Sequence, residues 1–282
     1  MKTQSVRLRK KHPVLSVILK IFATFLVFVL LLEIGVFALH IKKPYSPSYQ
    51  KVDISSIVLK TELSPHDYEL LFDQTGLSKI GVDSLLKSGR KDDILSIQEQ
   101  YFKNHSTSKI QFSPLTCCHE MEYEAQIALL EVGDIIISPT SHFSFFEMGH
   151  SAIVVDAEQG RVINATGYNN KSCYENISAI VVDPSFVILR PKAGSEIAKK
   201  AAKYAETELL DLHYSISIGV LGSKFQQKPI STHCSHLVWQ SYKKFGVDLD
   251  YNGGGVVLPM DIAKSDELEI VQIFGIDPKS LK

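Results

Sequence analysis

Residues 232–239, with the sequence Thr-His-Cys-Ser-His-Leu-Val-Trp, constrain the fold of this 282-residue chain most, because they place a cysteine at the start of a helix. Apolar residues recur at helical spacing after Cys234, and Gly246 stands just past the last turn. Ser231 or Thr232 is available as the N-cap. Cys234 is therefore predicted in the first helical turn, where free backbone N–H groups and the helix dipole favour the thiolate and lower the pKa of the thiol.

A histidine opens an apolar strand upstream of this helix. Residues 151–155 are apolar and β-branched enough to predict a largely buried strand, and His150 precedes them directly. A second strand is predicted at 161–165, after the turn residues Glu-Gln-Gly at 158–160, so a hairpin would bring Asn164 beside the His150 strand. Cys234, His150 and Asn164 then offer a nucleophile, a base and a group that orients the base.

Each of these three residues also has a purely structural interpretation. A free cysteine is often a small buried apolar residue. A histidine at a strand edge is usually a surface residue or a hydrogen-bonded core residue, and Asn164 can simply end its strand. The interpretation as a catalytic site depends on all three residues meeting in the fold.

Five segments occur in a characteristic order at residues 133–138, 149–150, 162–165, 234–239 and 258–265. Together they resemble the permuted papain-like amidases of the NlpC/P60 superfamily, in the pattern of the YycO and YiiX type of bacterial protein. In that group the histidine strand precedes the cysteine helix. The resemblance covers about residues 133–273 and implies Cys234 as nucleophile and His150 as general base. The third polar position, often a glutamate in such sequences, falls on Asn164.

The remaining pattern predicts an α+β fold. Strands in one run and helices in another favour an antiparallel sheet packed on the cysteine helix, and the resemblance implies its circularly permuted papain-like form. We expect this catalytic domain at 131–282, a small helical section at 63–130 and an extended linker at 43–62. Strands are predicted at 134–138, 150–156, 161–165, 186–189 and 269–274, and helices at 65–75, 82–87, 92–102, 195–210 and from Cys234.

The N-terminus predicts a membrane anchor. Basic residues at positions 2, 7, 9, 10 and 11 precede an apolar segment from Val14 to about Ile41, which is interrupted by Lys20 and Glu33. Residues 1–42 are therefore predicted to be a basic tail and a transmembrane helix, with a cleaved signal peptide as the alternative. By the positive-inside rule the following region is extracytoplasmic, either held at the cell membrane or secreted.

Charge and cysteine usage exclude some functions. Without the six basic residues among the first twenty, the net charge of −1 becomes about −7, so the exported part lacks the basic surface that nucleic-acid binding needs. No cofactor motif is present in the sequence. Of the four cysteines, Cys173 could form a bridge with Cys117 or Cys118, whereas Cys234 must stay free if it is catalytic.

The sequence therefore predicts a membrane-tethered, exported cysteine hydrolase that cleaves a peptide, isopeptide or acyl amide. Its substrate would be an amide-containing molecule, such as a cell-wall peptide or a lipid amide. One alternative is a catalytically silent binding module of the same fold. A second is a zinc-binding protein that uses His233, Cys234 and His236 with His213 or His150, although His233 and His236 lack the i, i+4 spacing of paired helical ligands.

Overall fold

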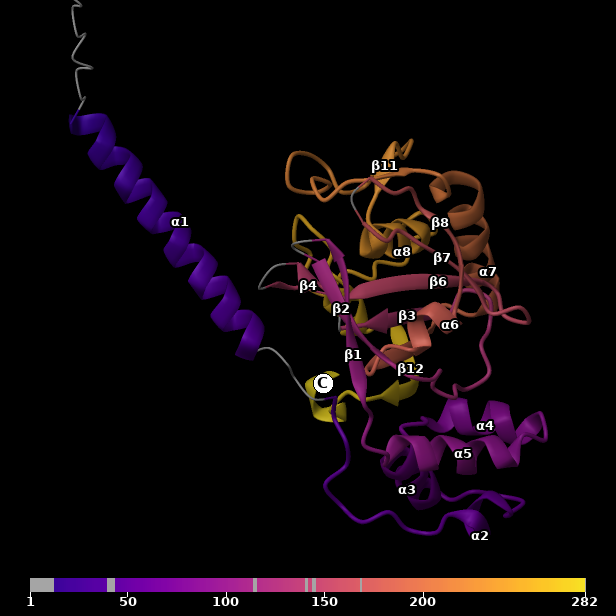
Figure 1. The fold of residues 1–282 in the computed structure, drawn as a ribbon. Helices are drawn as coiled ribbons and strands as arrows, with labels where there is room; N and C mark the ends of the chain where they lie inside the picture. Colours follow the sequence, from indigo (N-terminus) through magenta and orange to yellow (C-terminus); the bar gives the residue numbers. More distant parts are fainter. Residues whose placement is uncertain are drawn as a thin grey trace, which may run out of the picture. The chain divides into compact units, whose positions relative to one another are not determined.

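The computed structural model describes residues 13–39, 44–113, 116–139, 142–143, 146–167 and 169–281 (Figure 1). The chain divides into two compact units, Met1–Lys43 and Pro44–Lys282. The first unit contains helix α1 (Pro13–Leu39), while the predicted basic tail at residues 1–12 lies outside the described residues. The apolar side chains described on α1 are largely exposed, for example Phe22 and Leu31.

The predicted transmembrane helix is not confirmed. Within the described ranges of the chain, no helix is both long and apolar enough to cross a membrane. The sequence predicted the helical conformation of this segment correctly, since α1 covers nearly all of residues 14–41.

A six-stranded antiparallel sheet forms the centre of the second unit. Its strand order is β12-β9-β3-β6-β7-β8. Strands that are distant in sequence lie side by side in it, because β12 at the C-terminal end pairs with β9, and β9 pairs with β3. The bounds are β3 (Ile135–Ser138), β6 (His150–Asp156), β7 (Arg161–Asn164), β8 (Cys173–Asn176), β9 (Phe186–Pro191) and β12 (Leu268–Phe274).

Two apolar clusters cover the two faces of this sheet. Ile153 of β6 packs with one cluster and its neighbours Ala152 and Val154 with the other, as expected for side chains that alternate along a strand. We call these the cysteine face and the helical face. The cysteine face packs on α7 (Ser195–Tyr204), α8 (Cys234–Lys243) and α9 (Pro259–Ala263), and the helical face packs on α2 (Ser55–Val58), α3 (Pro65–Thr75), α4 (Lys79–Lys87), α5 (Lys91–Tyr101) and α6 (Ser178–Val181).

Helix α3 begins and ends where the sequence predicts, and α5 differs by one residue at each end, whereas α4 begins three residues earlier than predicted and α6 was not predicted. The Ser64 side chain accepts a hydrogen bond from the Asp67 N–H, and the Asp67 side chain accepts one from the Ser64 N–H, which forms a capping box at the start of α3. Gly76 ends this helix with φ of 71°, a conformation that glycine adopts without strain. The predicted linker differs, because it contains α2, whose Ile57 and Val58 are buried.

Several short strands were not predicted. Residues 63–130, expected to be helical, include β1 (Thr107–Ser113) and β2 (Thr116–Met121). These form a second antiparallel sheet of order β1-β2-β4-β5 with β4 (His142–Phe143) and β5 (Phe146–Glu147). The predicted helix at 195–210 consists of α7 followed by a π-helical turn, η1 (Ala205–Leu209). A separate 3-10 turn, η2 (Pro278–Leu281), lies near the C-terminus.

The predicted bridge between Cys173 and Cys118 is wrong, because neither of these two residues forms a disulfide. The side chain of Cys117 lies outside the described part of the structure. The α+β class and the antiparallel sheet packed on the cysteine helix are confirmed.

Candidate active site

Cys234 is the first residue of α8, as predicted, but its N-cap is a different residue. His233 has the extended backbone of a cap (φ −132°, ψ 171°), and its ring Nδ1 accepts a hydrogen bond from the His236 N–H at 3.3 Å. The prediction of Ser231 or Thr232 as N-cap is wrong, because these two residues form β11 (Ser231–Thr232), which pairs with β10 (His213–Tyr214) in parallel.

The Cys234 thiol is buried, with 7% of the residue exposed. Burial raises its pKa above the ordinary value, because a thiolate loses its hydration there. The backbone N–H groups of Ser151 and Ser235 act in the opposite direction without cancelling the rise. The low pKa predicted from the helix terminus is therefore wrong for this structure: desolvation outweighs the helix N-terminus, and the resting group is a neutral thiol.

Ser151 of β6 is the strand residue that faces this thiol. It alternates with Ala152, so it lies on the cysteine face together with Ile153. Its backbone N–H and its hydroxyl both favour the ionised form of Cys234. The hydroxyl is completely buried and forms no hydrogen bond within the described structure. Sequence reasoning missed Ser151, although strand alternation alone shows that it and His150 point to opposite faces.

His150 begins β6 and pairs with Ser138 of β3. Alternation places its side chain on the same face as Ala152, opposite to Ser151. The ring is half-buried, and burial lowers its pKa to about 4, so it is neutral at pH 7. Among the described residues, no hydrogen bond joins the His150 ring to Cys234 or to Asn164. The fold thus brings the predicted strand to the cysteine helix without joining the two side chains.

Asn164 lies on β7 beside β6, as the predicted hairpin requires. The pairing of Ile153 with Ile163 puts Asn164 on the face shared by Ala152 and His150. Its buried side chain donates from Nδ2 to Glu175 of β8, and its Oδ1 accepts from the Cys173 thiol at 3.9 Å. In this structure, Asn164 is held by β8.

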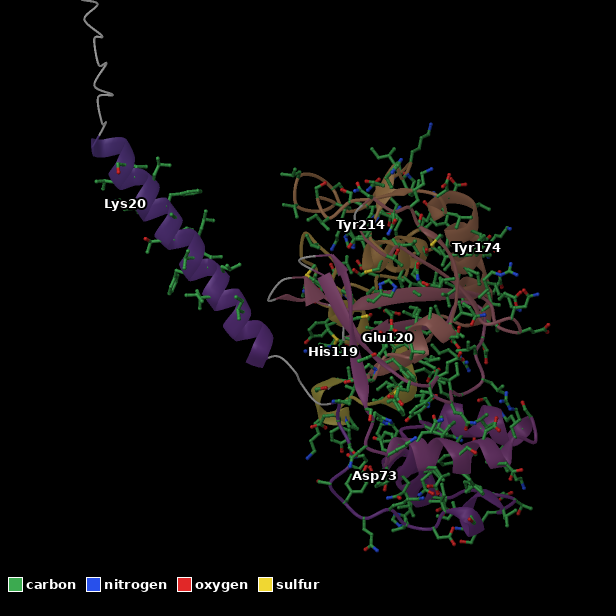
Figure 2. All side chains as sticks on the ribbon, in the orientation of Figure 1. Lys20, Asp73, His119, Glu120, Tyr174 and Tyr214 are labelled. Atoms are coloured by element: carbon green, nitrogen blue, oxygen red, sulfur yellow. The ribbon has the colours of Figure 1, made fainter. Side chains whose placement is uncertain are left out.

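Tyr214, which Figure 2 labels, is a second residue near the thiol that the sequence did not indicate, since the pKa of its hydroxyl responds to Cys234. Burial raises the pKa of its hydroxyl, and the proximity of Cys234 raises it further. Tyr214 therefore stays protonated and can donate a hydrogen bond near the thiol. It ends the short strand β10, which carries no periodic pattern by which sequence reasoning could have found it.

The zinc alternative gains no support from these side chains. His236 Nδ1 is hydrogen-bonded to the Thr232 hydroxyl at 2.9 Å, and its Nε2 lies 2.8 Å from the Lys224 carbonyl oxygen, to which it can only donate. Both ring nitrogens are thus engaged by protein. Within the described ranges, no group of three or more His, Cys, Asp or Glu residues is placed to hold a metal ion.

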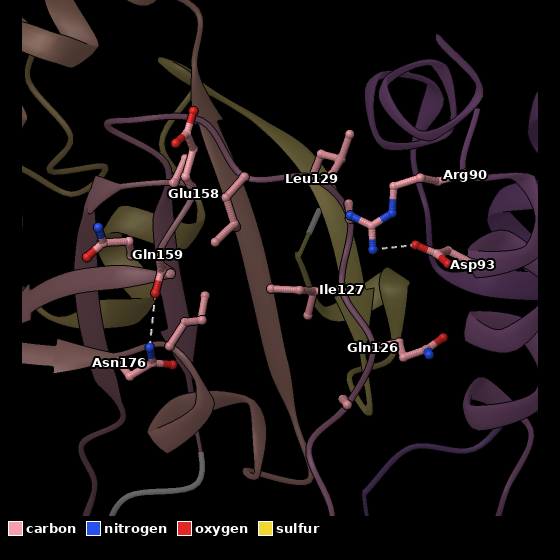
Figure 3. A pocket seen from close by; sticks show the side chains of 14 residues that line it. Arg90, Asp93, Gln126, Ile127, Leu129, Glu158, Gln159 and Asn176 are labelled. Atoms are coloured by element: carbon pink, nitrogen blue, oxygen red, sulfur yellow. Dashed lines mark hydrogen bonds and ion pairs between the residues drawn. The ribbon is translucent and has the colours of Figure 1, made fainter. Parts of the chain in front are cut away.

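A pocket of about 400 Å³ lies away from Cys234, between the start of α5, the extended segment 125–130 and the turn between β6 and β7. Figure 3 shows the Arg90–Asp93 ion pair on one side of it and the Asn176 side chain, which donates to the Gln159 carbonyl oxygen, on the other. None of the predicted site residues lines this pocket.

A scan against protein-family models, a search of curated proteins and a search of solved structures gave no match for this chain.

Proposed function

We propose that this protein is a cysteine-dependent hydrolase of the permuted papain-like type that cleaves an amide through Cys234. The observation that carries the proposal is the position of the thiol at the N-terminus of α8, against Ser151 at the start of β6. At this position backbone N–H groups that lack helical partners can stabilise both a thiolate and the oxyanion of a tetrahedral intermediate. No cofactor takes part in this reaction.

In this mechanism Cys234 Sγ attacks the amide carbonyl carbon while His150 accepts the thiol proton. Tyr214 and the Cys234 backbone N–H donate hydrogen bonds to the oxyanion. The amine then leaves with the proton from His150, and water hydrolyses the thioester with His150 again as base. Thiol and imidazole are both neutral at rest, because burial raises the pKa of one and lowers the pKa of the other. Proton transfer therefore accompanies attack, and no ion pair forms beforehand.

The assignment of His150 as base requires the start of β6 to rearrange when substrate binds, because strand alternation places the ring on the face opposite to Cys234. Catalytic hydrogen bonds are often long or misaligned in a free enzyme and tighten in the complex. We assign to Asn164 the orientation of the His150 ring, because the two residues share one sheet face.

The decisive experiment measures turnover of amide substrates and alkylation of the four thiols by iodoacetamide in the folded full-length protein. We expect Cys234→Ala to abolish turnover, and Cys234 to react faster when substrate analogues are absent than when they occupy the site. Turnover that survives in Cys234→Ala would contradict the mechanism. Chelators should have no effect.

The base is tested by the pH profile. Because burial lowers the pKa of His150 to about 4, kcat/KM should stay on a plateau through neutral pH and fall as the pH drops through about 4, where the ring becomes protonated. The same profile in His150→Ala, with unchanged plateau activity, would show that another group is the base.

A binding module of the same fold is the second candidate. The raised pKa of Cys234 and the engagement of Asn164 by Glu175 favour it. It predicts that no amide is turned over and that Cys234→Ser binds the ligand as tightly as the wild type.

We also propose that the region after residue 42 is extracytoplasmic and held at a membrane. The support is the basic cluster before an apolar segment and the exposed apolar side chains of α1. Fractionation of cells and protease treatment of intact cells test this. A full-length soluble form that the protease cannot reach would contradict it.

A further inference from the structure

The pocket beside α5 has two walls that come from distant parts of the sequence. One wall contains Arg90, Asp93 and the extended segment 125–130, and the other contains the β6–β7 turn and Asn176. The volume of about 400 Å³ lies within the roughly 300–1,000 Å³ that small-ligand pockets usually have. The pocket is separate from Cys234 and the residues around it, so a ligand here would serve another purpose than the thiol.

Half of the residues that line this pocket are apolar. Ile127, Leu129 and Leu130 of the extended segment and Ala157 of the β6–β7 turn pack against the apolar cluster of the helical face but are only partly buried. Figure 3 shows the Ile127 side chain pointing into the space between the two walls. A ligand that covers these side chains with its own apolar groups gains free energy from the surface it removes from water.

The wall formed by the β6–β7 turn carries a negative charge. Glu158 is exposed, and its carboxylate is paired with no cation in the part of the chain that the structure describes. Its backbone N–H donates to Asp156 Oδ1 at 3.1 Å, which fixes the turn from which the side chain extends. The carboxylate is therefore available to a cationic group of a ligand.

The opposite wall carries a positive charge, as Figure 3 shows for Arg90 and Glu158. Arg90 forms its ion pair with Asp93 through Nη2 at 2.5 Å, and a guanidinium has five N–H donors. Arg90 can therefore bind a second carboxylate. Arg190 of the same chain does so, because it pairs with two acidic side chains at 2.7 Å and 2.8 Å.

The extended segment also offers main-chain groups. The Gln126 carbonyl oxygen accepts from Gln272 Nε2 at 3.0 Å, and the Ala128 N–H donates to Gln272 Oε1 at 2.7 Å, so β12 holds one side of the segment. Main-chain groups of an extended chain alternate between its two sides, so those of Ile127 point away from Gln272. Neither the N–H nor the C=O of Ile127 has a hydrogen-bond partner among the described residues.

We propose that this pocket binds a short peptide with free ends and apolar side chains. The peptide main chain pairs with the N–H and C=O of Ile127, as when a strand is added to an exposed edge. Its ammonium group lies at Glu158 and its carboxylate at Arg90, while its side chains cover the apolar lining. A pocket of this volume holds only a short ligand, so both charged ends lie inside it.

Isothermal titration calorimetry on the full-length protein tests the chemistry of the ligand. The probes are leucyl-leucine, its C-terminal amide, its N-acetyl form and glycyl-glycine. We expect leucyl-leucine to bind at millimolar concentration or below, and each blocked end to raise the Kd about fourfold, as for an ion pair in contact with water. Glycyl-glycine should bind about tenfold more weakly or worse, because it lacks the apolar side chains.

Two variants test the location. Glu158→Gln should raise the Kd of leucyl-leucine about fourfold and leave that of the N-acetyl form unchanged, because the latter has no ammonium group. Arg90→Gln should weaken the N-acetyl form by a similar factor without weakening the amide, which has no carboxylate. Both side chains are exposed, so neither substitution is expected to prevent folding. Glu122→Gln is the matched control, because Glu122 is an exposed carboxylate that does not line the pocket.

Three outcomes would overturn the peptide site. They are an absence of binding by leucyl-leucine at millimolar concentration, equal Kd values for the free and the blocked peptides, and Kd values that Glu158→Gln and Arg90→Gln leave unchanged. No measurement involves turnover at Cys234, so the peptide site is tested independently of the proposed hydrolase activity.

Discussion

Each face of the central sheet carries an apolar cluster, yet the buried polar groups of the two faces differ in what they do. On the helical face, Gln98 donates to the Val52 carbonyl oxygen at 2.7 Å and to Gln74 at 3.0 Å, which fastens the chain before α2 to α3 and α5. On the cysteine face, Ser151 is buried without a hydrogen-bond partner in the described structure and lies against the Cys234 thiol. Burial of polar groups therefore serves packing around Gln98, whereas around Cys234 it sets the protonation state of a thiol.

The largest expected effect compares one leucine from each face. Leu237 of α8 and Leu85 of α4 are both completely buried, so Leu237→Ala and Leu85→Ala should each lower the free energy of unfolding by about 3 kcal/mol. Only Leu237→Ala should also slow alkylation of Cys234, because it loosens the helix that positions the thiol. Urea unfolding and thiol labelling measure the two effects.

An equal loss of Cys234 reactivity in both variants would contradict this separation of the faces. It would show that the helical face also positions the thiol, through the shared sheet.

Sequence patterns predicted the central sheet well because its strands are short apolar runs that end at turn residues. The hairpin from β6 to β7 appears as predicted, with Gly160 at φ of 62° in its turn. The same patterns missed β10 and β11, which are two residues long and have no periodicity. Strands of this kind form through tertiary contacts.

The candidate site was predictable only in part. Helical periodicity placed Cys234 correctly in the first turn of α8, because that depends on local sequence. Its pKa depends on how completely the fold removes water, which no local pattern contains. The partners of Asn164 likewise come from β8, a strand that the sequence did not indicate.

The second prediction concerns acid stability. Burial lowers the pKa of His236 to about 4, while an unfolded histidine titrates at about 6.5, so the unfolded chain binds the proton first as the pH falls. Stability is therefore lost between about pH 6.5 and 4, and this residue alone should cost roughly 2 kcal/mol between pH 7 and 5. Between pH 7 and 5 the free energy of unfolding of His236→Gln, measured with urea, should therefore fall by roughly 2 kcal/mol less than that of the wild type.

The free energy of unfolding at pH 7 serves as the control. It shows how much stability His236→Gln loses through its missing hydrogen bonds to Thr232 and Lys224, apart from any effect of pH. The variant can be less stable than the wild type at pH 7 and still show the weaker pH dependence. An identical loss from pH 7 to 5 in the two proteins would mean that His236 takes up no proton on unfolding in this range.

The smallest expected effect concerns Ser151 and has opposite signs in two measurements. The Ser151 hydroxyl is buried without a hydrogen bond in the described structure, so Ser151→Ala removes an unpaired polar group and should raise the free energy of unfolding by about 1 kcal/mol. The hydroxyl also favours the Cys234 thiolate, so its loss should raise the pKa of Cys234 further and slow alkylation about fivefold at pH 7.5.

Ser185→Ala is the matched control, because the Ser185 hydroxyl is buried but donates to the Gly275 carbonyl oxygen at 2.7 Å. That variant should lose stability and leave alkylation unchanged. A Ser151→Ala protein that alkylates at the wild-type rate would show that the backbone N–H groups alone act on the thiol, and that the unpaired hydroxyl has no part in its reactivity.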